Sequence, residues 1–190
     1  MATLDITLFG PPRAERDGVP VSFGRHHVLA LLAFLAVTDQ PHSRDALAAL
    51  FWPEMDDAAA HAALRRDLYY LGRGIGKGWL RCEEHAVALP AQPGLSVDVR
   101  RFGALAAAAT GHGHPAGQIC DGCLAALTEA ANLYQDDFLA GFTLRGSAEF
   151  DDWQSLTTEN LRLALAGVLE KLAAGLAARH EFDLALVHAR

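Results

Sequence analysis

The chain lacks long hydrophobic runs, a basic N-terminal segment and a regular pattern of cysteines. Its most apolar stretch, 27–37, is much shorter than the roughly 20 residues that a membrane-spanning helix needs. Residues 1–10 show no basic segment followed by an apolar one, so we expect no secretory leader and no membrane partner. The three cysteines are an odd number, which in a chain without a leader favours reduced thiols and a cytoplasmic protein.

Positive charge is scarce as well. The chain has 16 Lys+Arg against 23 Asp+Glu, a net charge of −7, whereas nucleic-acid-binding domains are often basic. Residues 1–93 have a net charge of −2 and residues 94–190 of −5. Only the window 61–81 is basic, with five cations against the single acid Asp67. Because screening limits charge effects in water to about 8–10 Å, this local patch matters more for DNA than the total does.

Sequence motifs of catalysis are absent. The chain has no GxxxxGK[ST] phosphate loop, no GxSxG nucleophile turn and no HExxH zinc helix. The acidic pairs at 136–137 and 151–152 fall at expected helix ends, where capping or solvation is their common role. We therefore expect neither an enzyme nor a bound cofactor.

What the sequence does contain is three helical patterns joined by two short breaks, in residues 25–71. The first helix is expected over 27–37 and the second over 44–51, after Pro41 and with Ser43 as its N-cap. The second break contains Pro53, and Asp56 or Asp57 can cap the third helix. Helix, break, helix, turn and basic helix are typical of a helix-turn-helix DNA reader.

The third helix has two distinct faces. At about 100° per residue, Leu64, Leu68, Leu71 and Ile75 fall within one arc and are expected to face the core. The glycines in 72–78 are expected to end the helix. Arginine suits both phosphates and guanine edges, and tyrosine can donate to a phosphate. The candidate DNA-binding residues on or near the other face are His61, Arg65, Arg66, Tyr69, Tyr70, Arg73, Lys77 and Arg81. The alternative is a solvated helix face that happens to hold arginines.

Strands are expected on both sides of these helices. Residues 79–89 predict a short hairpin with its turn near Glu83–His85, which in that place would be a wing. Alternation over 4–9 and the run 19–23, after Asp17-Gly18, predict two N-terminal strands. The predicted fold is mainly α with a small β part: an N-terminal winged helix-turn-helix, similar to the OmpR-like layout, in residues 1–93.

Residues 94–190 predict a second, all-α domain of the tetratricopeptide type. Helices are expected from about 97 to 109, capped by Ser96 or Asp98, then over 123–139 and from 151 to about 178. A further helix begins at 182, and because helical repeat arrays end in a polar capping helix, we expect the array to be truncated here.

One cluster of histidines and cysteines leaves a bound metal ion as the alternative to a chain without metal. His112, His114, Cys120 and Cys123 could supply four tetrahedral ligands to Zn²⁺. The same residues also fit two solvated loop histidines and two small residues at a helix start, because a single CxxC lacks the second pair of a zinc ribbon.

Several segments together resemble the SARP/AfsR-type bacterial transcriptional activators. They cover nearly the whole chain, and Gly72 stands where the family often has a second arginine, with Arg73 beside it. The segments are LFGPPR, FGRHHVLALLAFLA, SRDALAALFWPE, AALRRDLYYL, VDVRRF, CDGCLAALTEAANLYQDDFLAGF and EFDDWQSLTTENLRLALAGVLEKLA.

The resemblance implies an OmpR-like winged helix followed by a bacterial transcriptional activation domain. It further implies side-by-side binding to direct repeats in promoter DNA and recruitment of RNA polymerase. It maps the recognition helix onto 59–71. It also places Trp52, Glu54, Asp56 and Asp57 in the loop that faces polymerase.

The expected function is therefore a DNA-binding transcriptional activator, with double-stranded DNA, RNA polymerase and a second copy on DNA as partners. The alternative is a helical protein-interaction module whose winged helix no longer binds DNA, which would suit the acidic total. We also expect a fragment ending near Pro93 to keep salt-sensitive DNA affinity by itself.

Overall fold

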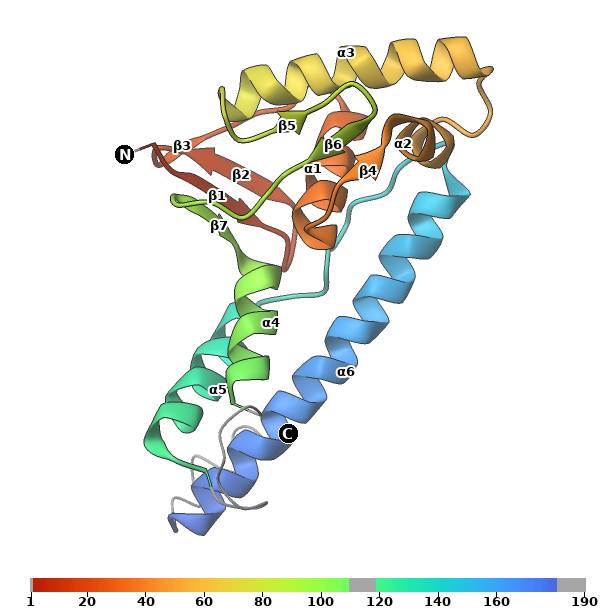
Figure 1. The fold of residues 1–190 in the computed structure, drawn as a ribbon. Coiled ribbons are helices and arrows are strands. Elements are labelled where there is room, and N and C mark those ends of the chain that lie inside the picture. The colour runs from red at the N-terminus through yellow and green to blue at the C-terminus, as the bar shows by residue number, and fades with distance from the viewer. Residues whose placement is uncertain (1, 110–118, 181–190) are drawn as a thin grey trace.

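The computed structural model describes residues 2–109 and 119–180, and it is mainly helical with a small amount of β-sheet (Figure 1). Six helices and seven short strands make up the described part of the chain. Among these residues no helix is both long and apolar enough to cross a membrane.

A four-stranded sheet is built from both ends of the first hundred residues. Strands β1 (Leu4–Thr7), β2 (Arg13–Arg16) and β3 (Val19–Pro20) are antiparallel, and β7 (Leu95–Val97) pairs in parallel with β1. The first expected strand ends at Thr7 rather than Phe9, and the second covers only two residues. β2 and β7 were not predicted, because each is short and β2 buries one side chain only, Ala14.

The helix-turn-helix prediction agrees with the structure. Helices α1 (His26–Thr38), α2 (Arg44–Phe51) and α3 (Asp57–Ile75) follow one another at the expected places. The Ser43 hydroxyl accepts the amide of Ala46 at 3.1 Å, and the Asp56 carboxylate accepts that of Ala59 at 2.9 Å. Of the two expected caps for α3, Asp56 is the one used.

The expected hairpin also forms. Strands β5 (Arg81–Cys82) and β6 (Ala86–Ala88) pair beside β4 (His42–Ser43), and the Glu83 amide donates to the Ala86 carbonyl across the turn. In Figure 1 this wing, β5 and β6, lies just below α3.

The glycines of residues 72–78 end α3 as expected, but the helix does not break at the first of them, Gly72. It runs through Gly72 and Gly74 to Ile75 and ends at Gly76, whose φ of +96° favours glycine. A Cβ at Gly74 would lie 2.6 Å from Phe23 Cε1, so this glycine lets the N-terminal segment pack closely on the helix.

The second half contains α4 (Asp98–Ala108), α5 (Asp121–Leu133) and α6 (Ala148–Ala178). α4 and α5 lie side by side, and α6 crosses the molecule as one long helix (Figure 1). α5 ends at Leu133 rather than 139, because Phe138 and Leu139 pair instead with Phe9 and Leu8, which follow β1. α6 begins three residues earlier than expected, capped by Ser147. The helix expected from 182 lies outside the described residues.

Neither Ser96 nor Asp98 caps α4. Both oxygens of Asp98 accept backbone amides, Oδ2 those of Leu8 and Phe9 at 2.8 and 2.9 Å and Oδ1 that of Val99. Burial raises the pKa of the Asp98 carboxyl above its ordinary value, and the amide hydrogen bonds oppose this shift. The carboxylate therefore fastens the start of α4 to the end of β1.

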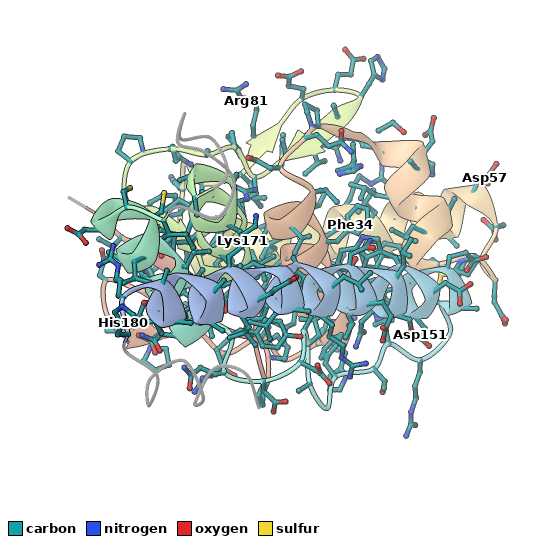
Figure 2. All side chains as sticks on the ribbon, turned by 90° about the horizontal axis from the view of Figure 1, so that it is seen from below. Phe34, Asp57, Arg81, Asp151, Lys171 and His180 are labelled. Atoms are coloured by element: carbon teal, nitrogen blue, oxygen red, sulfur yellow. The ribbon has the colours of Figure 1, made fainter. Side chains whose placement is uncertain are left out.

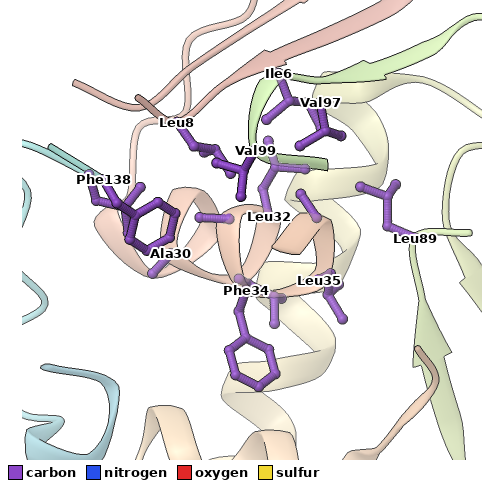
Figure 3. Packing of buried hydrophobic residues seen from close by; sticks show 14 of the residues in the cluster. Ile6, Leu8, Ala30, Leu32, Phe34, Leu35, Leu89, Val97, Val99 and Phe138 are labelled. Carbon is purple, nitrogen blue, oxygen red and sulfur yellow. The ribbon is translucent and has the colours of Figure 1, made fainter. Parts of the chain in front are cut away.

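The two halves share one hydrophobic core. Figure 3 shows Val97, Val99 and Phe138 of the second half among Ile6, Leu8 and Ala30 of the first. Figure 2 shows α6 running across one face beneath Phe34 of α1, whose ring lies 4.9 Å from that of Trp153. The Phe51 ring lies 5.5 Å from Phe150. Residues 95–97 complete the sheet although they follow residue 93, where the sequence places the division between the domains.

Candidate nucleic-acid interface

The exposed face of α3 carries the arginines and tyrosines expected there. Arg65, Arg66, Tyr69, Tyr70 and Arg73 are all exposed, whereas Leu64, Leu68, Leu71 and Ile75 are buried. Tyr69 and Tyr70 are 60% and 45% exposed, which is high for aromatic side chains. The Arg73 guanidinium lies 5.9 Å from the centre of the Tyr69 ring, a cation–π distance. The predicted helix phase is therefore confirmed.

An open groove runs between α3 and the wing. Near the start of α3 it is lined by Arg44, His61, Arg65 and Glu84, among others. Near the end of α3 it is lined by Arg16, Tyr69, Arg73, Lys77 and Cys82, with neighbouring apolar and glycine residues. The groove thus brings Lys77 together with the α3 residues, whereas Arg81 is exposed on β5 outside the groove lining.

Arg44 fixes the wing against α2. Its Nε and Nη2 both donate to the Glu83 carbonyl at 3.2 Å, and the Arg44 amide donates to the His85 carbonyl. The wing turn is therefore held in place by a residue at the start of α2. Arg44 is absent from the set predicted from sequence.

His61 is held by acceptors on both ring nitrogens. Nδ1 lies 2.7 Å from the Asp57 carbonyl, and Nε2 lies 2.8 Å from the Asp45 carboxylate. The Asp57 carbonyl, followed by Asp45, raises the pKa of His61 above 6.5, since two acceptors favour the doubly protonated ring. Both ring nitrogens of His61 are thus engaged inside the protein, and neither is free to read a base.

We expect Asp45→Asn to lower the His61 pKa toward 6.5. Because the folded-state pKa lies above the unfolded one, stabilisation by this contact is fully present below pH 6.5 and is lost as the pH rises through the folded pKa. An NMR titration of the His61 ring in the wild type and in Asp45→Asn measures the shift. Identical titration curves would remove Asp45 as a cause.

Asp67 is a buried acid on the same helix that was not among the predicted site residues. It is 1% exposed, and its Oδ1 lies 3.1 Å from Arg66 Nε and 3.9 Å from Arg25 Nη1. The Arg25 guanidinium also lies 5.6 Å from the centre of the Tyr70 ring. Arg25, which precedes α1, therefore also lies beside α3, next to Tyr70 and outside the lining of the groove. The helical phase could have found Asp67, because it lies three residues after Leu64 and four before Leu71.

Arg66 consequently has two roles. Its Nε is used inside the protein, which leaves the remaining guanidinium N–H groups for a ligand. Replacing Arg66 would therefore perturb the packing around Asp67 as well as any DNA contact, so Arg73 is the better residue for testing DNA contact.

The loop between α2 and α3 divides into a buried and an exposed part. Trp52 is buried and its ring stacks on His27 at 5.2 Å, so it is a core residue. Burial lowers the pKa of His27, which keeps that ring neutral near pH 7. Glu54, Asp56 and Asp57 are exposed. The Ser147 hydroxyl donates to the Leu50 carbonyl, which fixes the start of α6 beside this loop.

The zinc hypothesis involves four residues, of which the structure describes Cys120 and Cys123. His112 and His114 lie outside the described residues. Cys120 is exposed at the N-cap of α5, and Cys123 is buried one turn later. No group of three or more His, Cys, Asp or Glu side chains in the described ranges 2–109 and 119–180 is arranged to hold a metal ion.

No family model matches the sequence, and no curated protein matches it either. Among solved structures the chain is similar to Mycobacterium tuberculosis EmbR, determined in complex with a low-affinity phosphopeptide. The sequences are 23% identical and the TM-score is 0.67. The match covers 100% of this chain and 52% of EmbR, so the chain spans about half the length of that structure. At 23% identity the similarity establishes the fold, and it does so for both halves of the chain.

Proposed function

We propose that this chain is a sequence-specific DNA-binding transcriptional regulator, and that it activates transcription from promoters with direct repeats by recruiting RNA polymerase. The observation that carries the proposal is the exposed arginine and tyrosine face of α3 beside an open groove that carries further cations. The shared fold with EmbR, a transcriptional regulator, supports a regulatory role in general.

The acidic total charge does not oppose this proposal, because the charge around α3 differs from the average. Of the two acids in α3, Asp57 lies at the first position of the helix, and Asp67 is buried and engaged by two arginines. Three arginines from other elements lie beside the helix: Arg16, Arg25 and Arg44. Since DNA responds to charge within about 8–10 Å, the surface that it would meet is basic.

The geometry suits reading in the major groove. A helix with its side chains is about 10–12 Å wide and the major groove of B-DNA is about 12 Å wide, so α3 can enter it. Arg65 and Arg73 project from the exposed face, where a guanidinium can donate to O6 and N7 of guanine. Tyr69 and Tyr70 can donate to phosphates at the groove edges.

The activating part of the proposal rests on the resemblance to the SARP/AfsR-type activators. The exposed acids Glu54, Asp56 and Asp57 would face polymerase, and the helical half would position a neighbouring copy or the polymerase. The division into residues 1–93 and 94–190 is retained as a functional proposal: the first part reads DNA and the second part activates.

Arg73→Ala is expected to weaken binding to the chain's own operator by about 1–3 kcal/mol, the usual cost of losing an arginine that reads a base. Footprinting of the upstream region identifies the operator, and gel-shift titration measures the affinity. Thermal stability should remain unchanged, because Arg73 is exposed.

The matched control is Arg101→Ala, which removes the same charge from the exposed face of α4. Equal affinities for wild type, Arg73→Ala and Arg101→Ala would remove this face of α3 from the interface.

The negative net charge of the chain favours one other candidate, a helical protein-interaction module whose winged helix no longer binds DNA. The salt dependence of DNA binding separates the two candidates, because the affinity of a DNA-binding protein falls steeply as the salt concentration rises. Absence of DNA binding even at low salt would favour the interaction module.

A further inference from the structure

We propose that Arg16, on strand β2, joins Arg73 and Lys77 to form a binding site for a backbone phosphate of DNA at the C-terminal end of α3. The ligand is a phosphodiester group, recognised without regard to base sequence. This inference rests on the proposed DNA binding and adds to it a residue from the N-terminal sheet.

The three cations meet in the part of the groove next to the end of α3. Arg16 Nη1 donates to the Gly74 carbonyl at 3.3 Å, and a Cβ added at Gly76 would lie 3.3 Å from Arg16 Cδ. The Arg16 side chain therefore lies directly against the last turn of α3. That bond uses one of the five guanidinium N–H groups, and it is the one hydrogen bond that this side chain makes among the described residues.

The charge lining this part of the groove is entirely positive. Its lining contains Arg16, Arg73 and Lys77 and neither aspartate nor glutamate, whereas the part near the start of α3 contains Glu84. Tyr69 adds a hydroxyl donor. These groups provide charge and hydrogen-bond donors in the combination that holds phosphate oxygens.

The location makes the added arginine necessary. The C-terminal end of a helix carries about half a negative charge on its last carbonyls, which by itself repels a phosphate. Arg16 covers one of these carbonyls, and Arg73 and Lys77 lie beside it. The end of the recognition helix thereby becomes attractive to an anion.

The path of DNA past the helix brings a phosphate to this place. When a helix fills the major groove, the two sugar–phosphate backbones run along its two sides. The wing side of α3 is this groove, with Arg44 and Arg65 near the start of the helix and Arg16 near its end. A backbone on that side would pass Arg16.

The test compares two arginines of the same strand. Arg16→Ala and Arg13→Ala remove the same charge from β2, but Arg13 lies at the other end of the strand, about 10 Å away, and does not line the groove. Binding is measured by fluorescence anisotropy with a random-sequence duplex of about 30 base pairs, at salt concentrations from about 50 to 200 mM. Because a phosphate contact does not depend on sequence, the operator is not needed.

The expected result is a fall of about 0.9 in the slope of log K against log salt for Arg16→Ala, the loss of one phosphate contact. Arg13→Ala should change the slope by less than half as much, and Arg16→Lys should keep it near the wild-type value. Thermal unfolding of each variant shows whether the fold is preserved.

If Arg16→Ala and Arg13→Ala have equal slopes while the wild type binds the duplex, this inference is wrong and the proposed function stands. A lower melting temperature for Arg16→Ala with an unchanged slope would show that Arg16 only offsets the charge of the helix end. Failure of the wild type to bind at about 50 mM salt would overturn both the inference and the proposed function.

Discussion

A fragment ending at residue 93 is expected to be unfolded, although the sequence pattern alone leads us to expect that it binds DNA by itself. The fragment lacks β7, which pairs with β1, and Asp98, which accepts the buried amides of Leu8 and Phe9. It also exposes Phe34 and Phe51, which pack on rings of the second half. A domain is stable by only about 5–15 kcal/mol, and each large aromatic contact contributes a few kcal/mol, so these losses together are comparable with that margin.

Circular dichroism and urea unfolding of the fragment measure this. A fragment of residues 1–180 is the matched control, because it keeps every contact described above, and it should unfold cooperatively. A fragment of residues 1–109 restores β7 and Asp98 but not the aromatic cover from α6, and we expect partial stability. Cooperative unfolding of residues 1–93 with the stability of the control would show that the first half folds independently.

Arg100→Met is expected to destabilise the whole chain by about 3–5 kcal/mol. Arg100, on α4, donates to the Leu35 and Leu89 carbonyls at 3.2 and 2.8 Å and also to the Ala36 carbonyl. Leu35 and Ala36 lie in the last turn of α1, whose carbonyls have no partner within the helix. Methionine keeps most of the side-chain volume but leaves these carbonyls without a donor.

The neighbouring residue provides the control. Arg101 is exposed and forms a surface ion pair with Glu129, so Arg101→Met should cost no more than about 1 kcal/mol. Urea unfolding of both variants gives the comparison. If the two variants lost equal stability, Arg100 would not be the link between α4 and the end of α1 that the geometry indicates.

Among the features that the sequence determined are the three helices, the caps of α2 and α3 and the orientation of α3. Ser43 and Asp56 act within three residues of the amides that they accept, and the leucines of α3 repeat within one helix. The wing turn at 83–85 is local in the same way. These features depend on residues that are close together in the chain, so the spacing of residue types is enough to predict them.

Only the tertiary structure decided which other residues join these elements. β7 meets β1 across about ninety residues, and its three-residue length leaves no periodic signal. Arg16 lies in strand β2, Arg25 just before α1 and Arg44 at the first position of α2, and they reach the neighbourhood of α3 because the sheet, the start of α1 and the start of α2 pack there. The same holds for Asp98 and Arg100, whose hydrogen bonds go to backbone groups that carry no sequence signature, although Arg100 also pairs with the Asp39 carboxylate. The hydrophobic periodicity of a helix or strand predicts which of its faces is buried. Which other element covers that face depends on the packing of the whole chain.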